Sequence, residues 1–182
     1  QVPVLVVVNN VGYCYGYPAS GLILTGGFYL SGVVFKNEWA RETGVILGTA
    51  FATSTLLVSV LKPVIGRTRP GNGTGNLNFH PFSPEAKFHS FPSGHSAIAF
   101  TLSFVLAKRV NNKTLKIFFY TIAASTAFCR LYSNAHWLSD VYLGGTMAWF
   151  STTGSIKHLS TNRFKALRST HVSVRPNIGG MT

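Results

Sequence analysis

A histidine and the one aspartate of the chain, His136 and Asp140, stand four residues apart in the segment CRLYSNAHWLSD. A carboxylate beside a histidine fixes the tautomer of the imidazole and stabilises its charged form, which leaves the second ring nitrogen facing outward. The simpler alternative is a surface pair at i,i+4, which would stabilise a helix by roughly 0.2–0.5 kcal/mol. The chain has only four acidic residues, and apolar residues flank the pair, so the functional interpretation is favoured.

The tetrapeptide PSGH opens an apolar run of the chain. Ser93 is well placed to cap a helix, and Gly94 lets the backbone approach a ligand closely. The first turn of a helix offers free N–H groups and the positive end of the helix dipole, which together form a seat for an oxyanion. His95 would lie just inside that turn, beside the bound anion. A simple helix cap followed by a surface histidine explains the tetrapeptide equally well.

Three cations, Lys62, Arg67 and Arg69, occur close together in the segment KPVIGRTRP. Lys62 and Arg69 are seven residues apart, so two helical turns would stack them on one face, although Pro63 and Gly66 make such a helix imperfect. Cations that converge at a helix end bind anions, and arginine offers a planar fork that matches phosphate oxygens. Taken alone, a solvated basic helix end is the favoured explanation of this segment.

Arg130 lies six residues before His136, which on one helix would place the two about 240° out of phase. A break near Ser133 and Asn134 must therefore bring them together, and an asparagine suits such a break. The three segments would then supply cations, a helix N-terminus, two histidines and an aspartate to one place. Such a set would hold a tetrahedral, multiply charged oxyanion, with one histidine to attack it and another to protonate the leaving group.

These segments resemble the motifs of the type 2 phosphatidic acid phosphatase / vanadium haloperoxidase superfamily. The pattern of that family is Lys-x6-Arg-Pro, then Pro-Ser-Gly-His, then Ser-Arg-x5-His-x3-Asp, and every spacing is kept here between Lys62 and Asp140. One position departs from the pattern, because Cys129 stands where the family usually has serine, next to Arg130. Three ordered motifs with fixed spacing make the resemblance highly specific.

The resemblance implies a role for each motif residue. His136 would be the nucleophile that forms a phosphohistidine, Asp140 would orient it, and His95 would protonate the leaving alkoxide. The phosphate oxygens would be bound by Lys62, Arg69, Arg130, Ser93 and the backbone N–H of Gly94. The implied activity is hydrolysis of a phosphate monoester or diphosphate of a lipid or another extracytoplasmic substrate, with no metal and no other cofactor. Vanadate would act on such an enzyme as an inhibitor.

Two other functions stay open from the sequence. In a vanadate-dependent haloperoxidase the same residues would hold vanadate as a cofactor, with His136 bonded to vanadium, but the haloperoxidases that the motifs resemble are much larger. A non-catalytic module that binds anions or membranes would fit the net charge of +12 and would make no demand on His136 or Asp140. Nucleic-acid binding ranks lowest, because the cations cluster around the histidines and follow no aromatic groove.

The elements that must position these residues are helices. Uncharged apolar runs predict an all-α helical bundle of about five or six helices in a single domain, residues 1–182. The helices are expected at residues 21–35, 43–61, 96–107, 117–129 and 141–156. Glycine, proline and asparagine predict an irregular N-terminal segment at residues 1–20 and a long loop at residues 71–90. Residues 157–182 form a basic tail that is expected to be less ordered.

The charge balance favours an anionic partner, either a phosphorylated substrate or an anionic membrane surface. Charged residues make up 11% of the chain, against about 25% in ordinary globular proteins. Only residues 43–61 approach the ~20 apolar residues that a membrane span needs, and residues 96–107 would cover roughly 18 Å. A soluble or membrane-surface bundle is slightly favoured over an integral one, and both stay open. The resemblance places the site on the periplasmic or extracytoplasmic side.

Overall fold

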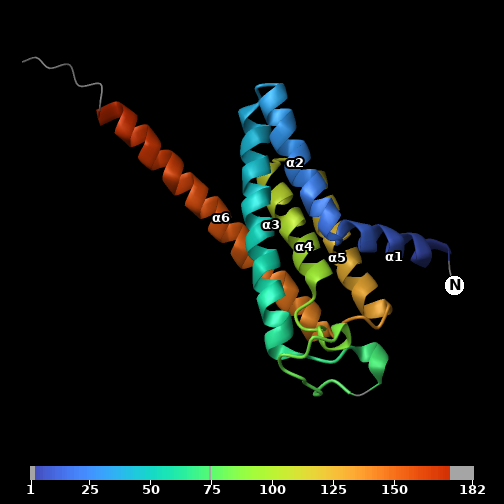
Figure 1. Ribbon diagram of the computed structural model, residues 1–182. Helices are drawn as coiled ribbons and strands as arrows, with labels where there is room; N and C mark the ends of the chain where they lie inside the picture. The colour runs from blue at the N-terminus through green and yellow to red at the C-terminus, as the bar shows by residue number, and fades with distance from the viewer. Residues whose placement is uncertain (1–2, 74, 173–182) are drawn as a thin grey trace, which may run out of the picture.

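The computed structural model describes residues 3–73 and 75–172, which form an all-α bundle (Figure 1). Its helices are α1 (Pro3–Tyr15), α2 (Pro18–Val34), α3 (Glu38–Ile65), α4 (Gly94–Arg109), α5 (Lys113–Tyr132) and α6 (Leu138–Val172). The long loop between α3 and α4 carries two short 3-10 turns, at Pro70–Asn72 and Ala86–Phe88. The predicted bundle of five or six helices is confirmed, and so is the break in regular structure between α3 and α4.

The N-terminal segment is helical, so the prediction of an irregular chain over residues 1–20 is wrong. Gly12 in α1 and Gly16 directly after it let this part of the chain lie directly on α5. A Cβ atom added at Gly12 would stand 3.0 Å from the carbonyl oxygen of Ser125. The hydroxyl of Thr126 donates a hydrogen bond to the carbonyl of Gly12 at 2.9 Å. Packing against α5 therefore stabilises a helix whose composition alone favours turns.

The C-terminal helix α6 is longer than the apolar run that predicts it. The helix continues to Val172 and so includes residues 157–172 of the basic tail. This stretch contains no glycine and no proline, and nothing in its backbone chemistry interrupts a helix that is already nucleated. The remainder of the predicted tail, residues 173–182, lies outside the described residues.

The centre of the bundle is the contact between α3 and α4, with α6 packed against both, α2 against α3 and α5 against α4 (Figure 1). Leu47 and Ala50 of α3 meet Leu102 and Val105 of α4, and all four side chains are fully buried. Burying one such leucine contributes about 1.5–3 kcal/mol. This core fixes the end of α3 relative to the start of α4, and these are the two elements that carry the first two motifs.

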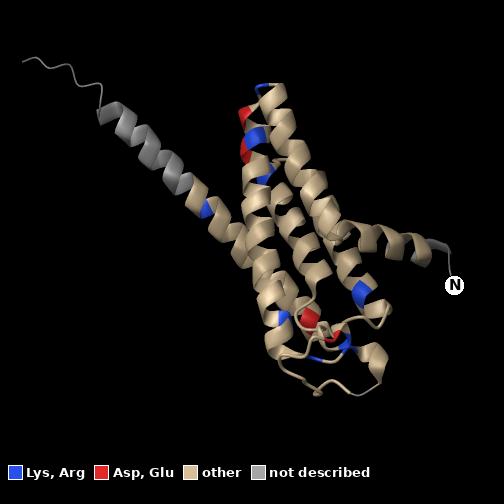
Figure 2. Ribbon diagram, viewed as in Figure 1, with Lys and Arg blue, Asp and Glu red and all other residues tan. Residues whose placement is uncertain are grey.

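The charged residues of α3, α4 and α5 lie near the ends of these helices, and the middle turns of the three helices carry no charge (Figure 2). The ion pairs Glu38–Arg41 and Glu42–Arg109 lie at one end. The cations and the aspartate of the three motifs lie at the other end. Among the described helices, α3 is the one that is both long and apolar enough to cross a membrane.

Candidate active site

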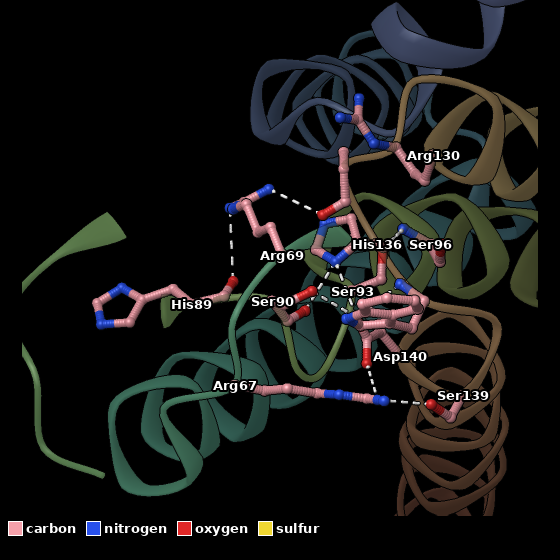
Figure 3. Close-up of polar contacts among 12 residues, drawn as sticks. Arg67, Arg69, His89, Ser90, Ser93, Ser96, Arg130, His136, Ser139 and Asp140 are labelled. Carbon is pink, nitrogen blue, oxygen red and sulfur yellow. Dashed lines mark hydrogen bonds and ion pairs between the residues drawn. The ribbon is translucent and has the colours of Figure 1, made fainter. Parts of the chain in front are cut away.

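The three motifs meet at one end of the bundle (Figure 3). The first lies at the end of α3 and in the loop that follows, the second opens α4, and the third runs from the end of α5 to the start of α6. The chain leaves α3 at Gly66, whose φ of 63° is left-handed. A Cβ atom there would stand 1.9 Å from the carbonyl oxygen of His80, so only glycine fits. This turn sends the loop back across the helix ends.

Lys62 and Arg69 point toward the same backbone carbonyl. Nζ of Lys62 donates to the oxygen of His89 at 2.7 Å, and Nη2 of Arg69 reaches the same oxygen at 3.4 Å. Nη1 of Arg69 donates to the carbonyl of Ala135 at 3.2 Å. The structure therefore brings the two cations together as predicted. The predicted stacking on one helix face is wrong, because α3 ends between the two residues and the loop carries Arg69 back.

The start of α4 is built as the PSGH motif predicts. Oγ of Ser93 accepts a hydrogen bond from the backbone N–H of Ser96 at 3.4 Å, and Gly94 and His95 form the first turn of the helix. A Cβ atom at Gly94 would stand 3.7 Å from Cε of Lys62, so the lysine lies along the bare backbone of the helix start. The positive end of the α4 dipole and a lysine thus form one wall of the site.

A left-handed turn brings Arg130 and His136 together, which confirms the break that their spacing predicts. Asn134, just after the end of α5, has a φ of 51°. The carbonyl of Arg130 then accepts hydrogen bonds from the N–H groups of Ala135 and His136, each at 3.2 Å. The chain between α5 and α6 is thereby closed on itself, and the last arginine of α5 stays beside the histidine of the third motif.

The imidazole of His136 is held by a carbonyl group and not directly by Asp140 (Figure 3). Nδ1 lies 2.7 Å from the carbonyl oxygen of Ser90 and 3.7 Å from Oδ2 of Asp140. A carbonyl oxygen can only accept, so Nδ1 carries the proton and Nε2 keeps its lone pair. His136 also precedes α6, so His136 and Asp140 do not lie on one turn of a helix, and the alternative of a surface i,i+4 pair on a helix is wrong. Asp140 acts on the imidazole through its charge and through Ser90.

Asp140 is fully buried and makes strong contacts with both carboxylate oxygens. Oδ2 accepts from Oγ of Ser90 at 2.5 Å and from the backbone N–H of Trp137 at 2.8 Å. Oδ1 pairs with Nη1 of Arg67 at 2.6 Å. The aromatic rings within 6 Å of the guanidinium carbon, at 5.5–5.8 Å, belong to Phe79, Phe91 and Trp137. The ion pair therefore lies in an apolar box, where its Coulomb attraction is weakly screened.

Arg67 and Ser90 are the site residues that motif spacing does not assign. Arg67 belongs to the segment KPVIGRTRP, and a buried aspartate demands a positive partner, so the sequence holds a signal for the Arg67–Asp140 pair. Ser90 carries no comparable signal, because its contacts with Asp140 and His136 depend on the path of the loop between α3 and α4.

Burial shapes the protonation of the site. The pKa of His136 is lowered to about 4, chiefly because the ring is buried and partly because of nearby cations. The pKa of His95 is lowered to about 4, first by burial and then by the charge of Arg130. Burial raises the pKa of Asp140, but its hydrogen bonds and the charge of Arg67 lower it overall. Near pH 7 the site therefore presents two neutral imidazoles and one carboxylate.

His95 shares this site with His136. Its Nε2 atom is buried and has no hydrogen-bond partner among the described residues. The charges of Arg130, Lys62 and Arg69, and that of His136 when protonated, all act on its ring. The structure thus brings together the site residues that the motifs predict, and Nε2 of His95 is buried there without a hydrogen-bond partner among the described residues.

Residues 43–164 match the PAP2 superfamily. Lipid A 1-phosphatase of Rhizobium etli is 37% identical over 118 residues, which cover 62% of this chain and 49% of that protein. Phosphatidylglycerophosphatase B of Bacillus subtilis is 34% identical over 120 residues, which cover 61% of this chain and 53% of that protein. This chain therefore spans about half the length of these curated relatives.

The fold agrees with this match. The crystal structure of LpxE from Aquifex aeolicus superposes with a TM-score of 0.66 at 24% identity, over 86% of this chain and 87% of that one. The matched region contains all three motifs, from Lys62 to Asp140. The chain belongs to the PAP2 superfamily.

Proposed function

We propose that the protein is a phosphatase that hydrolyses a lipid-linked phosphate monoester or diphosphate through a phosphohistidine intermediate. The observation that carries the proposal is the state of His136, whose Nδ1 proton is held by the carbonyl of Ser90 and whose Nε2 lone pair is left free. Lys62 and Arg69 converge on the carbonyl of His89, and their charges act on the His136 ring. Nε2 of His95 is buried without a hydrogen-bond partner among the described residues. This is the set that in-line attack on a phosphoryl group requires.

In the first step, the cations and the start of α4 bind the phosphate oxygens, and Nε2 of His136 attacks phosphorus. The P–O bond to the leaving group breaks, and the leaving alkoxide takes a proton from His95. The negative charge of the bound phosphate offsets the repulsion and the burial that lower the pKa of His95, so the ring can hold this proton in the complex. In the second step, His95 takes a proton from water, water attacks phosphorus, and the P–N bond breaks to release phosphate.

Asp140 stabilises the imidazolium character that His136 gains as its Nε2 bonds to phosphorus. The carboxylate lies 3.7 Å from Nδ1 and holds Ser90, whose carbonyl orients the ring. Its lowered pKa keeps it ionised throughout this cycle at neutral pH. The proposal needs no metal ion, because the lysine and the arginines supply the positive charge that Mg²⁺ supplies in other phosphoryl-transfer enzymes.

A lipid substrate is favoured by where the site lies. The site is at one of the two charged ends of a bundle in which the middle turns of α3, α4 and α5 carry no charge, and α3 is long and apolar enough to cross a bilayer (Figure 2). The relatives are named for phosphate groups on lipid A and on phosphatidylglycerol. We therefore place the bundle in a membrane, with its phosphate site at the extracytoplasmic surface where lipid headgroups lie.

The test is an assay on the whole chain in detergent micelles. We expect release of inorganic phosphate from long-chain phosphatidate in the presence of EDTA, slower release from glycerol phosphate, and loss of both on addition of vanadate. Oxidation of bromide by peroxide after vanadate is added would contradict the proposed phosphatase activity and identify the protein as a haloperoxidase. Binding of phosphate without hydrolysis of either substrate would identify the protein as a non-catalytic module that binds anions.

His95→Ala is expected to slow hydrolysis of an alkyl phosphate by about 10²–10⁴-fold, because the leaving alkoxide must be protonated. The same variant should lose far less activity on p-nitrophenyl phosphate, whose phenolate leaves without a proton. Steady-state kcat on the two substrates measures the difference. Equal losses on both would remove His95 from the role of general acid.

A further inference from the structure

We infer that α1 completes the active site and that Tyr13, a residue outside the family match, positions the guanidinium of Arg130 and covers His95. The inference rests on the proposed function, because it concerns the same phosphate site. Residues 43–164 carry the match, so nothing in the three motifs assigns a role to this helix.

The ring of Tyr13 contacts two residues of the site. Its centroid lies 5.4 Å from the guanidinium carbon of Arg130 and 5.0 Å from the ring centroid of His95. The ring of Tyr17 follows at 6.0 Å from Tyr13 and 6.2 Å from His95. The two tyrosines therefore form an aromatic cover over the side of His95 that faces α1.

The direction of the Arg130 side chain depends on the ring of Tyr13, whereas Arg67 and Arg69 are held by hydrogen bonds or an ion pair. Arg69 donates to three backbone carbonyls, and Arg67 is fixed by the carboxylate of Asp140. Nε of Arg130, in contrast, is buried and has no hydrogen-bond partner among the described residues. The face of Tyr13 is then the contact that sets the direction of this guanidinium, through a cation–π interaction.

The position of Tyr13 is fixed by the backbone of α1. A Cβ atom at Gly16, the residue that follows α1, would stand 2.8 Å from the carbonyl oxygen of His95 and 2.7 Å from Cγ2 of Thr126, so this bare glycine lets the end of α1 lie against the start of α4. Sγ of Cys129 donates to Oδ1 of Asn9 at 2.9 Å. The one residue that departs from the family pattern therefore also faces α1.

The test measures binding of inorganic phosphate and of vanadate to the whole chain in detergent micelles, independently of turnover. Tyr13→Leu is expected to raise the Kd of both anions by about 2- to 30-fold, the range of a cation–π contact, with a smaller effect on kcat. Tyr13→Phe keeps the aromatic face and should stay within about 2-fold of the wild type. Tyr29→Leu, on α2, is the matched control, because Tyr29 is 45% exposed and Tyr13 is 43% exposed.

A double-mutant cycle separates positioning from a general loss of structure. In an Arg130→Gln background, Tyr13→Leu should change the phosphate Kd by less than 2-fold, about the scatter expected for uncoupled sites. An undiminished effect in that background, or an equal loss in Tyr13→Phe, would overturn the inference. If wild-type protein binds phosphate and Tyr13→Leu binds it equally well, the inference fails while the proposed function stands. If the wild type binds no phosphate, both fail.

A second variant reaches the same contact without touching the ring. Gly16→Val is expected to push α1 away from the start of α4 and to weaken phosphate binding as Tyr13→Leu does. Gly27→Val is its control, because a Cβ atom at Gly27 meets nothing within 4 Å. Unchanged phosphate affinity in folded Gly16→Val would also count against a role for α1 in the site. If Tyr13→Leu fails to fold, Gly16→Val and Gly27→Val still test whether α1 contributes to phosphate binding.

Discussion

His136→Ala is expected to abolish turnover, with a loss of about 10⁴-fold or more in kcat on every phosphate substrate. The variant removes the only protein atom that the proposed mechanism bonds to phosphorus. Lys62 and Arg69 keep their contacts with the carbonyl of His89, and neither contact depends on the imidazole. Binding of inorganic phosphate should therefore change much less than kcat, and this split identifies a residue that acts in the chemical step.

The measurement needs a histidine control and a trap for the intermediate. His89→Ala is the control, because the ring of His89 lies at the same end of the bundle and contacts the carbonyl of Ser83 instead of the site. Brief reaction with a radiolabelled substrate, followed by denaturation in alkali, should leave acid-labile label on the wild type and none on His136→Ala. Label on His136→Ala, or full activity in it, would assign the nucleophile to another group.

The parts of the site that follow local rules could be predicted from the sequence. Ser93 was expected to cap α4, and Asn134 to break the chain between Arg130 and His136, and both expectations hold in the structure. In each case a short stretch of backbone decides the result: a hydroxyl takes a free N–H group, and an asparagine tolerates a left-handed conformation. The motif residues could likewise be named, because their chemistry and spacing are written along the chain.

The parts that depend on distant packing could not be predicted. A glycine inside a helix, such as Gly12, weakens that helix by roughly 1 kcal/mol, and Gly16 directly follows α1, so from the sequence both indicate turns. In the structure the same missing side chains let α1 approach the backbones of Ser125 and His95, and the helix is stable through that contact. The sequence cannot distinguish these two uses of glycine, because the distinction lies in a partner more than seventy residues away.

The contact between His136 and the carbonyl of Ser90 has the same origin. Four residues between His136 and Asp140 suggest a direct pair, yet the loop between α3 and α4 inserts a carbonyl group at 2.7 Å from Nδ1. The path of that loop is set by Gly66 and by the hydrogen bond from the N–H of Ser90 to the carbonyl of Arg67, at 3.0 Å. Asp140 therefore does more than pair with His136. It holds the loop through Ser90 and also stabilises positive charge on the imidazole of His136.

Arg67→Met is expected to destabilise the protein by ~3–5 kcal/mol and to lower its activity together with its stability. The substitution keeps most of the side-chain volume inside the aromatic box but leaves the carboxylate of Asp140 buried without a counter-charge. An uncompensated buried charge either draws in water or becomes protonated. In both cases the hydrogen bond from Ser90 to Asp140 weakens, and with it the carbonyl that orients His136.

Thermal unfolding in detergent micelles, compared with an exposed ion pair of the same chain, measures this effect. Arg41→Met breaks the ion pair between Arg41 and Glu38, whose side chains are 50% and 67% exposed, respectively. This variant should change the stability by less than about 1 kcal/mol. Asp140→Asn alone leaves Arg67 without its counter-charge and should lower the stability as much as Arg67→Met does. The double variant Arg67→Met/Asp140→Asn removes both charges, so it should unfold at a higher temperature than either single variant. Strictly additive losses would show that the two side chains contribute independently, and would contradict a stabilising Arg67–Asp140 ion pair.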